Sequence, residues 1–185
     1  MRMTGLILLA ALAVPAANAV EYQTVLPKQS TIHFEFRQMG VPIKGGFKRF
    51  TTQMAFDPAK PEAARAQIEI DLASIDAGSS EADEESAGKL WFNRSIYPKA
   101  TFVSSQVRAL GNNRYEMRGT LTLKGKSRDM VVPVTFAPGK NAATFDGAFV
   151  LRRLDFGIGE GMWADVATVA NEVQVRFRIA ATGNY

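Results

Sequence analysis

Tyr115-Glu116-Met117-Arg118-Gly119-Thr120-Leu121-Thr122-Leu123 alternates strictly, with polar residues at even positions and apolar residues or glycine at odd positions. The stretch 145–151 has a related pattern, with Phe145, Gly147, Phe149 and Leu151 at its odd positions. A side-chain period of two places each set on one face of a β-strand. Glycine on a face that should fill a core leaves room there. The two stretches therefore predict a β protein with an apolar interior and open space beside Gly119 and Gly147.

Similar alternation recurs in residues 31–37, 67–72, 130–136 and 173–179. Turn-forming residues lie between the runs, at Gly111-Asn112-Asn113, Lys124-Gly125-Lys126 and Pro138-Gly139-Lys140-Asn141. This spacing favours consecutive antiparallel hairpins, and we expect an all-β fold with a single antiparallel barrel of about eight strands.

Two segments depart from the simple strand pattern. The inward parity switches near Arg49, which predicts a bulge or bend in a long strand. Ser80 followed by acidic residues is typical of a helix start, since a Ser cap and first-turn carboxylates complement the helix dipole. We expect one short helix near residues 80–92, with Ala82, Leu90 and Trp91 or Phe92 on its buried side. Its acidic cluster is interpreted as a solvated helix start rather than a metal or acid–base site.

The first nineteen residues have the form of a secretory signal peptide. Arg2 supplies a positive charge, residues 5–14 are apolar, and Ala17-Asn18-Ala19 is a cleavage motif. The apolar run is well short of the ~20 residues that a membrane-spanning helix needs. We therefore expect residues 1–19 to be removed and residues 20–185 to form one exported, soluble domain, periplasmic in a Gram-negative bacterium.

The composition argues against most catalytic and nucleic-acid functions. Cysteine is absent and His33 is the only histidine, so the chain offers no thiol nucleophile and no multi-histidine metal site. The glycines of 157–161 lack the spacing of a dinucleotide-binding loop, and no nucleophile elbow surrounds a serine. With a net charge of +4, the sequence does not indicate the strongly basic surface that is typical of nucleic-acid-binding proteins. We predict no enzyme activity, no cofactor, no metal and no nucleic-acid partner.

Three groups of residues allow two interpretations each. The 157–161 loop with its apolar neighbours is either a lid or portal over a cavity or a loop packed over the barrel end. Lys124, Lys126 and Arg128 favour a solvated turn, the alternative being a contact to a lipid headgroup or phosphate. Arg152-Arg153 has the same two interpretations.

The aromatic residues favour a dry interior, since twelve Phe stand against four Tyr and two Trp. An eight-stranded barrel can hold a small ligand among such side chains. The candidate ligand-binding residues are Phe34, Phe36, Phe47, Met54, Phe56, Ile70, Phe102, Met117, Gly119, Leu121, Gly147, Phe149, Phe156, Trp163, Val175 and Phe177.

A set of short motifs follows in order from about Gln29 to Ile179. They are Ser30-Thr31-Ile32-His33-Phe34, Met39-Gly40-Val41, Gly45-Gly46-Phe47, Phe56-Asp57-Pro58, Tyr97-Pro98-Lys99-Ala100-Thr101-Phe102, Gly119-Thr120-Leu121-Thr122-Leu123-Lys124-Gly125 and Asp155-Phe156-Gly157-Ile158-Gly159. In this order the chain resembles the YceI-like family of exported polyisoprenoid-binding proteins. Many members carry His before the Leu-Gly pair of the second strand, where this chain has Gln38 before Met39-Gly40.

The resemblance implies a lipocalin-like barrel and a periplasmic binding or carrier protein that holds a long-chain isoprenoid lipid. Its ligand would be a polyprenyl phosphate or an isoprenoid quinone. The alternative is a non-catalytic structural or interaction β-barrel of the cell envelope. A transient contact with a membrane surface and a homodimer remain open as further interactions.

Overall fold

The computed structural model describes residues 20–184, so the predicted signal peptide lies outside the described residues. These residues form the strands β1 (Glu21–Val25), β2 (Thr31–Gln38), β3 (Val41–Phe47), β4 (Phe50–Ala55), β5 (Arg65–Asp71), β6 (Ile75–Asp76), β7 (Lys99–Gly111), β8 (Arg114–Leu123), β9 (Lys126–Ala137), β10 (Ala143–Arg152) and β11 (Glu172–Asn184). They also form the helix α1 (Ser80–Ala87) and the 3-10 turns η1 (Pro27–Gln29), η2 (Pro61–Ala63), η3 (Leu72–Ser74), η4 (Arg153–Phe156) and η5 (Gly161–Ala164).

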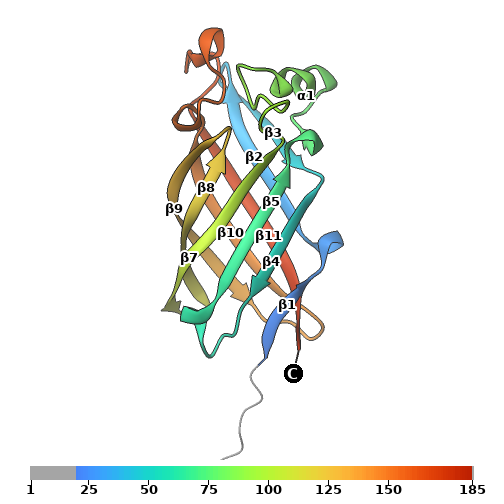
Figure 1. Cartoon of the computed structure of the whole chain (residues 1–185), viewed down its shortest axis with the longest axis vertical. Helices are drawn as coiled ribbons and strands as arrows, with labels where there is room; N and C mark the ends of the chain where they lie inside the picture. Colours follow the sequence, from blue (N-terminus) through green and yellow to red (C-terminus); the bar gives the residue numbers. More distant parts are fainter. Residues whose placement is uncertain (1–19, 185) are drawn as a thin grey trace, which may run out of the picture.

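The strands form one strongly curled antiparallel sheet (Figure 1). Their order is β4-β5-β7-β8-β9-β10-β11-β2-β3-β6, and β1 pairs with β11. The strands β3 and β4 lie near opposite edges of the sheet, so the chain changes direction between them. The parity switch near Arg49 marks this bend. Tyr22 in β1 also exchanges two backbone hydrogen bonds with Phe56 after β4, which ties the two sides together at the lower end in Figure 1. The predicted all-β, antiparallel, lipocalin-like fold with one helix is confirmed.

The barrel is solidly packed at the β1 end. The ring of Phe56 lies 5.1 Å, between centroids, from each of the rings of Tyr115, Phe136 and Phe145. Tyr22 from β1 packs edge-on against Phe136 at 5.3 Å. Buried aliphatic residues from β7, β9 and β11 complete this cluster. Side chains therefore fill most of the lower half of the barrel, at close to the packing of a protein core.

The open space expected above Gly119 and Gly147 is absent. A Cβ atom at Gly147 would collide with the ring of Phe177, its direct cross-strand partner. A Cβ at Gly119 would collide with the ring of Phe102 and with the main-chain oxygen of Val103. The prediction was wrong because the strand register, which a face pattern does not reveal, brings a phenyl ring over each glycine. The glycines instead let these rings lie over the neighbouring strand.

The opposite end of the barrel is covered by α1, residues 88–98 and residues 153–171, which we call the cap (Figure 1). The hydroxyl of Ser79, not Ser80, caps α1 by accepting a hydrogen bond from the Ala82 amide. The helix ends at Ala87 and Gly88 follows it, so the predicted helix was too long. Leu90, Trp91 and Phe92 lie in the turns after the helix instead of on its buried side.

Candidate functional site

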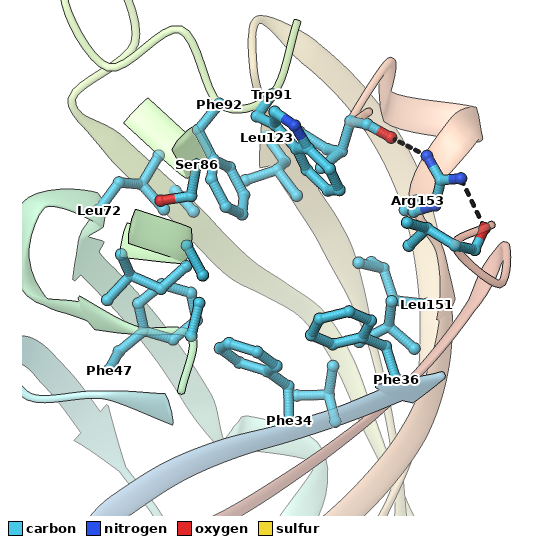
Figure 2. A pocket seen from close by; sticks show the side chains of 18 of the residues that line it. Phe34, Phe36, Phe47, Leu72, Ser86, Trp91, Phe92, Leu123, Leu151 and Arg153 are labelled. Atoms are coloured by element: carbon cyan, nitrogen blue, oxygen red, sulfur yellow. Dashed lines mark hydrogen bonds between the residues drawn. The ribbon is translucent and has the colours of Figure 1, made fainter. Parts of the chain in front are cut away.

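A cavity of about 560 Å³ lies beneath the cap, in the upper half of the barrel (Figure 2). This volume falls in the range of about 300–1,000 Å³ typical of small-molecule sites. The barrel part of its wall is apolar except for Gln38 at the end of β2. Its apolar residues come from β2, β3, β5, β6, β7, β8, β10 and β11, and they are Ile32, Phe34, Phe36, Phe47, Ile70, Ile75, Ala100, Leu121, Leu123, Phe149, Leu151, Val173 and Val175.

The structure brings one part of the predicted site residues together in this cavity and places the others elsewhere. Those in its wall are Phe34, Phe36, Phe47, Ile70, Leu121, Phe149, Trp163 and Val175. A second cavity, of about 60 Å³ at the β1 end, is lined by Met54, Phe56, Met117 and Phe177. Phe102 packs against the lower core, Phe156 is buried near the cap, and Gly119 and Gly147 lie under phenyl rings.

The cap and the neighbouring Ser79 supply cavity residues that are absent from the list of candidate ligand-binding residues. They are Ser79, Glu81, Ala82, Glu85, Ser86, Trp91, Phe92, Arg153, Ile158 and Val169. These side chains come from a helix, turns and 3-10 segments, so they share no period that a face pattern could detect. The adjacent Trp91-Phe92 pair is the one feature of the sequence that indicates this part of the site, because two large aromatic side chains outside a strand are expected to pack against an apolar surface.

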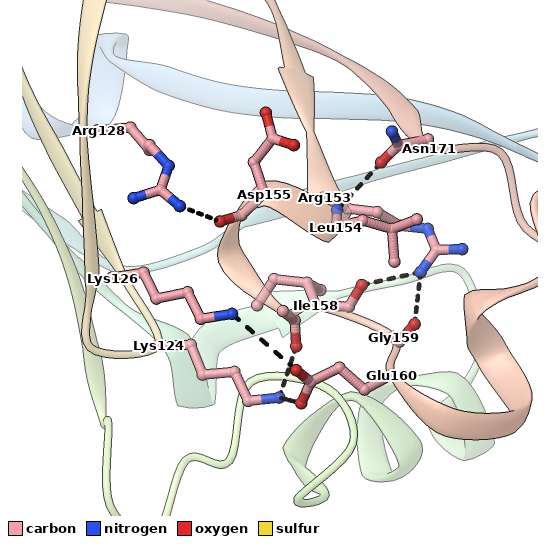
Figure 3. Close-up of polar contacts among 11 residues, drawn as sticks. Lys124, Lys126, Arg128, Arg153, Leu154, Asp155, Ile158, Gly159, Glu160 and Asn171 are labelled. Atoms are coloured by element: carbon pink, nitrogen blue, oxygen red, sulfur yellow. Dashed lines mark hydrogen bonds and ion pairs between the residues drawn. The ribbon is translucent and has the colours of Figure 1, made fainter.

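Arg153 is the centre of the cap, and only 2% of its surface is exposed. Its Nε donates to the Ala170 oxygen at 3.0 Å. Its Nη1 donates to the oxygens of Ile158 and Gly159, both at 2.8 Å, and its Nη2 to those of Trp163 and Val169, both at 2.7 Å (Figures 2 and 3). All five N–H groups of the guanidinium thus have backbone acceptors.

These bonds fix how the 153–171 segment sits on the barrel. The amide of Ala170 donates to the Arg37 oxygen at the end of β2, so the carbonyls that hold Arg153 are themselves tied to the barrel wall. Burial lowers the pKa of Arg153 from its usual value. The interpretation of Arg153 as a solvated residue was wrong, because its side chain turns inward and organises the loop.

The basic turn after β8 packs against the same segment (Figure 3). Lys124 Nζ donates to the Gly157 oxygen at 2.6 Å and to Glu160 Oε2 at 3.0 Å. Arg128 donates to the Asp155 oxygen at 3.1 Å. The hydrogen bond from Lys124 lowers the pKa of the Glu160 carboxyl. The interpretation of this turn as solvated was wrong for Lys124, whose side chain is only 9% exposed. The 157–161 loop is therefore anchored from two sides and packed over the barrel end.

Two tryptophans stand side by side where the cap meets the cavity. The rings of Trp91 and Trp163 are 5.6 Å apart between centroids. Trp163 Nε1 donates to Glu85 Oε1 at 2.9 Å, which joins η5 to α1. Trp91 Nε1 is buried and has no hydrogen-bond partner among residues 20–184. An unpaired buried donor is uncommon in a folded protein and calls for an explanation.

Residues 20–184 contain no group of three or more His, Asp or Glu side chains placed to hold a metal ion. None of the helices in this range has the length and apolar character needed to cross a membrane. His33 lies exposed on the outer face of β2, opposite Gly46.

A family model described as the YceI-like domain matches residues 23–181. The chain belongs to the YceI-like family. Its YceI-like relatives include a UPF0312 protein of Vibrio cholerae serotype O1, 31% identical over 90% of this chain and 95% of the relative. Another is a UPF0312 protein of Pseudomonas savastanoi pv. phaseolicola, 33% identical over 77% of this chain and 80% of the relative.

Solved structures share this YceI-like fold. BcnA of Burkholderia cenocepacia is 44% identical, with a TM-score of 0.83 over 85% of this chain and 99% of BcnA. A polyisoprenoid-binding domain from Saccharophagus degradans has a TM-score of 0.64 and 15% identity over 90% of this chain and all of that domain. At this identity the second likeness shows the fold alone.

Proposed function

We propose that this YceI-like protein is an exported carrier that holds a long-chain isoprenoid lipid in the barrel interior. The observation that carries the proposal is the cavity itself, which has apolar barrel walls and polar groups gathered near the cap. Burial of each CH₂ group contributes about 0.8 kcal/mol, so a prenyl chain can bind there with few polar contacts. The fold shared with a domain described as polyisoprenoid-binding supports the same ligand class.

We propose a binding role without catalysis. The titratable side chains in the cavity wall are Glu81, Glu85 and Arg153. Arg153 uses all its donors on backbone carbonyls, and Glu85 accepts a hydrogen bond from Trp163. A general acid or base needs to reach the proton it transfers, and these contacts commit Arg153 and Glu85 to holding the cap. The Glu81 carboxyl is in turn bonded to its own backbone amide and to Ser79 at the start of α1. The alternative, a structural or interaction barrel of the cell envelope, gives no role to an apolar cavity.

The protein purified from its own source is expected to carry an isoprenoid lipid that solvent extraction and mass spectrometry detect. Val175→Trp should reduce the amount carried, because Val175 lines the cavity and the larger side chain would occupy it. Gln174→Trp is the matched control, since Gln174 is exposed on the outer face of the same strand. If well-folded protein yields no lipid and added prenyl lipids do not bind, the proposed function fails.

We further propose that residues 20–185 form the mature lipid-binding domain in the periplasm. The reason is the short apolar run ending at Ala17-Asn18-Ala19. N-terminal sequencing of the exported form is expected to begin at Val20. Recovery of uncleaved chain in the membrane fraction would contradict both the cleavage and the location.

A further inference from the structure

Four exposed apolar side chains lie at the cap end of the molecule. Met39 and Val41 belong to the turn between β2 and β3 and the first residue of β3, and Met162 and Val166 belong to the loop 161–168. Among the large apolar side chains of residues 20–184, Met162 is the most exposed at 77%, and Met39 follows at 73%. We call these four residues the apolar tip.

Backbone hydrogen bonds hold the two segments of the apolar tip side by side. The Met39 amide donates to the Thr168 oxygen at 2.9 Å, and Gln38 pairs with Val169 in an antiparallel bridge. Figure 1 shows the loop 161–168 at the top of the molecule, with the β2–β3 turn beside it. Two segments that are far apart in the sequence therefore present their apolar side chains at the same end.

The one carboxylate of the loop 161–168 is committed to the loop itself. Asp165 is the only ionisable residue in this loop. Its Oδ1 accepts from the Ala167 amide at 2.9 Å, and its Oδ2 accepts from the Thr168 hydroxyl at 3.3 Å. Met162 and Val166 on either side of it stay uncovered. Exposed apolar residues that gather in one place mark an interaction site more often than scattered ones do.

The backbone of Met39 makes its side chain harder to explain from within the chain. Met39 has a φ of 48° and Gly40 a φ of 80°, so both central residues of the hairpin turn are left-handed. Such a turn favours Asn-Gly, and a bulky side chain is uncommon there. Met39 is also mostly exposed, so core packing does not compensate for this conformation. The methionine is accounted for by a contact outside the chain.

The segments of the apolar tip form the roof of the cavity on their inner side. Gln38 and Trp163 line the cavity, and each is the sequence neighbour of a tip residue. Val169, which pairs with Gln38, lines the cavity as well. The apolar tip and the cavity are therefore the outer and inner sides of the same two segments.

Two cations stand behind the β2–β3 turn. Arg37 and Lys44 are exposed near the ends of β2 and β3 that meet at this turn, and Arg37 Nη1 donates to the Gly40 oxygen at 2.9 Å. Long basic side chains can reach lipid phosphates while neighbouring apolar side chains enter the boundary of the acyl chains. An apolar tip with cations behind it is complementary to the surface of a phospholipid bilayer.

We infer that the apolar tip docks on a phospholipid bilayer and brings the roof of the cavity against the membrane. A lipid then passes between the bilayer and the cavity without crossing bulk water. The docking itself depends only on the apolar tip and the cations behind it, whereas the lipid transfer rests on the proposed function.

Co-sedimentation of delipidated residues 20–185 with vesicles of phosphatidylcholine and phosphatidylglycerol in equal amounts tests the docking. Met39→Asn combined with Met162→Gln is expected to lower the affinity for vesicles about tenfold or more, since each apolar side chain that leaves water contributes to binding. Asn suits the left-handed turn better than Met does, so thermal stability should be unchanged or slightly higher. Wild-type protein that stays in the supernatant would overturn the inference.

Two valines provide a matched control. Val41→Thr in the apolar tip should weaken vesicle binding, whereas Val131→Thr on the outer face of β9 should leave it unchanged. The two side chains have similar exposure, 58% and 51%, so the substitutions differ mainly in their place on the molecule. Equal losses in both variants would refute the assignment of docking to the tip. A wild-type dimer in sedimentation velocity that the double variant dissociates would refute it too, because the tip would then join two copies of the chain.

A prenyl probe separates docking from the lipid site. The double variant should bind tetraprenyl alcohol from detergent micelles as well as the wild type does, but should take it up from vesicles several-fold more slowly. Equal uptake from vesicles would contradict the role of the tip in lipid transfer. If neither protein binds the probe from micelles, the proposed function fails, while the co-sedimentation result still decides the docking.

Discussion

Arg153→Met is expected to lower the free energy of unfolding by about 4 kcal/mol and to detach the 153–171 segment from the barrel. Methionine keeps much of the aliphatic stem but leaves five backbone carbonyls without their donor. Hydrogen bonds to a charged group contribute about 1.5–3 kcal/mol each, and a buried acceptor left unpaired costs about 1–3 kcal/mol. Partial opening of the segment admits water to these carbonyls, so the loss in the free energy of unfolding is well below the sum of these contributions.

Urea unfolding measures the global loss, and amide hydrogen exchange over residues 153–171 measures the local opening. Arg152→Met is the matched control, because Arg152 is the exposed neighbour. Arg153→Lys should fall between the wild type and Arg153→Met, since one ammonium has three donors at a single point and cannot span all five carbonyls. Wild-type stability and exchange in Arg153→Met would show that the cap does not depend on this side chain.

Gly119→Leu is expected to destabilise the protein by about 3 kcal/mol, the upper part of the usual range for overpacking a filled core. Its Cβ alone would overlap both the Phe102 ring and the Val103 carbonyl oxygen. The ring can rotate away, but the carbonyl belongs to β7, the strand paired with β8 at this point, and cannot move without disturbing the ladder. If the open space that the sequence predicted beside Gly119 existed, the leucine side chain would fill it without loss of stability, so the two expectations differ.

Thermal and urea unfolding of lipid-free protein decide between them. Gly147→Ala provides a graded comparison, since its Cβ collides mainly with the far end of the Phe177 side chain and the Pro133 oxygen is less crowded. Gly147→Ala should therefore cost less than Gly119→Ala. Relief of the Gly147→Ala defect by Phe177→Leu would identify the ring as the obstacle. Unchanged or improved stability of Gly119→Leu would mean that the ring and the carbonyl can both yield at little cost.

The strand arrangement could be predicted because it depends on local signals. The period of two predicts the strands β8 and β11, and the turn residues at 111–113 and 124–126 predict the turns between strands. Each of these predictions uses only neighbouring residues. The site could be predicted only in part. Phe34 and Phe56 have similar patterns in the sequence, yet one lines the cavity and the other fills the packed end. Which half of the barrel stays hollow depends on where distant strands meet.

The burial of Arg153 is a second feature that could not be predicted from the sequence. An arginine beside Arg152 in a segment without periodicity is usually a surface residue. Its burial depends on carbonyls from positions 158 to 170, which converge on it only after the segment has folded over the barrel. A single residue of this kind carries no local signature, because its partners are backbone atoms that any residue type supplies.

The aromatic packing at the β1 end makes the proposed lipid site a tube with one blind end. A prenyl chain bound in the proposed site would end where the packed aromatic core of the β1 end begins. The depth of the cavity then limits the length of tail that can bind in an extended conformation. A tail longer than this depth has to double back on itself, while the headgroup keeps the same place beneath the cap whatever the length of the chain.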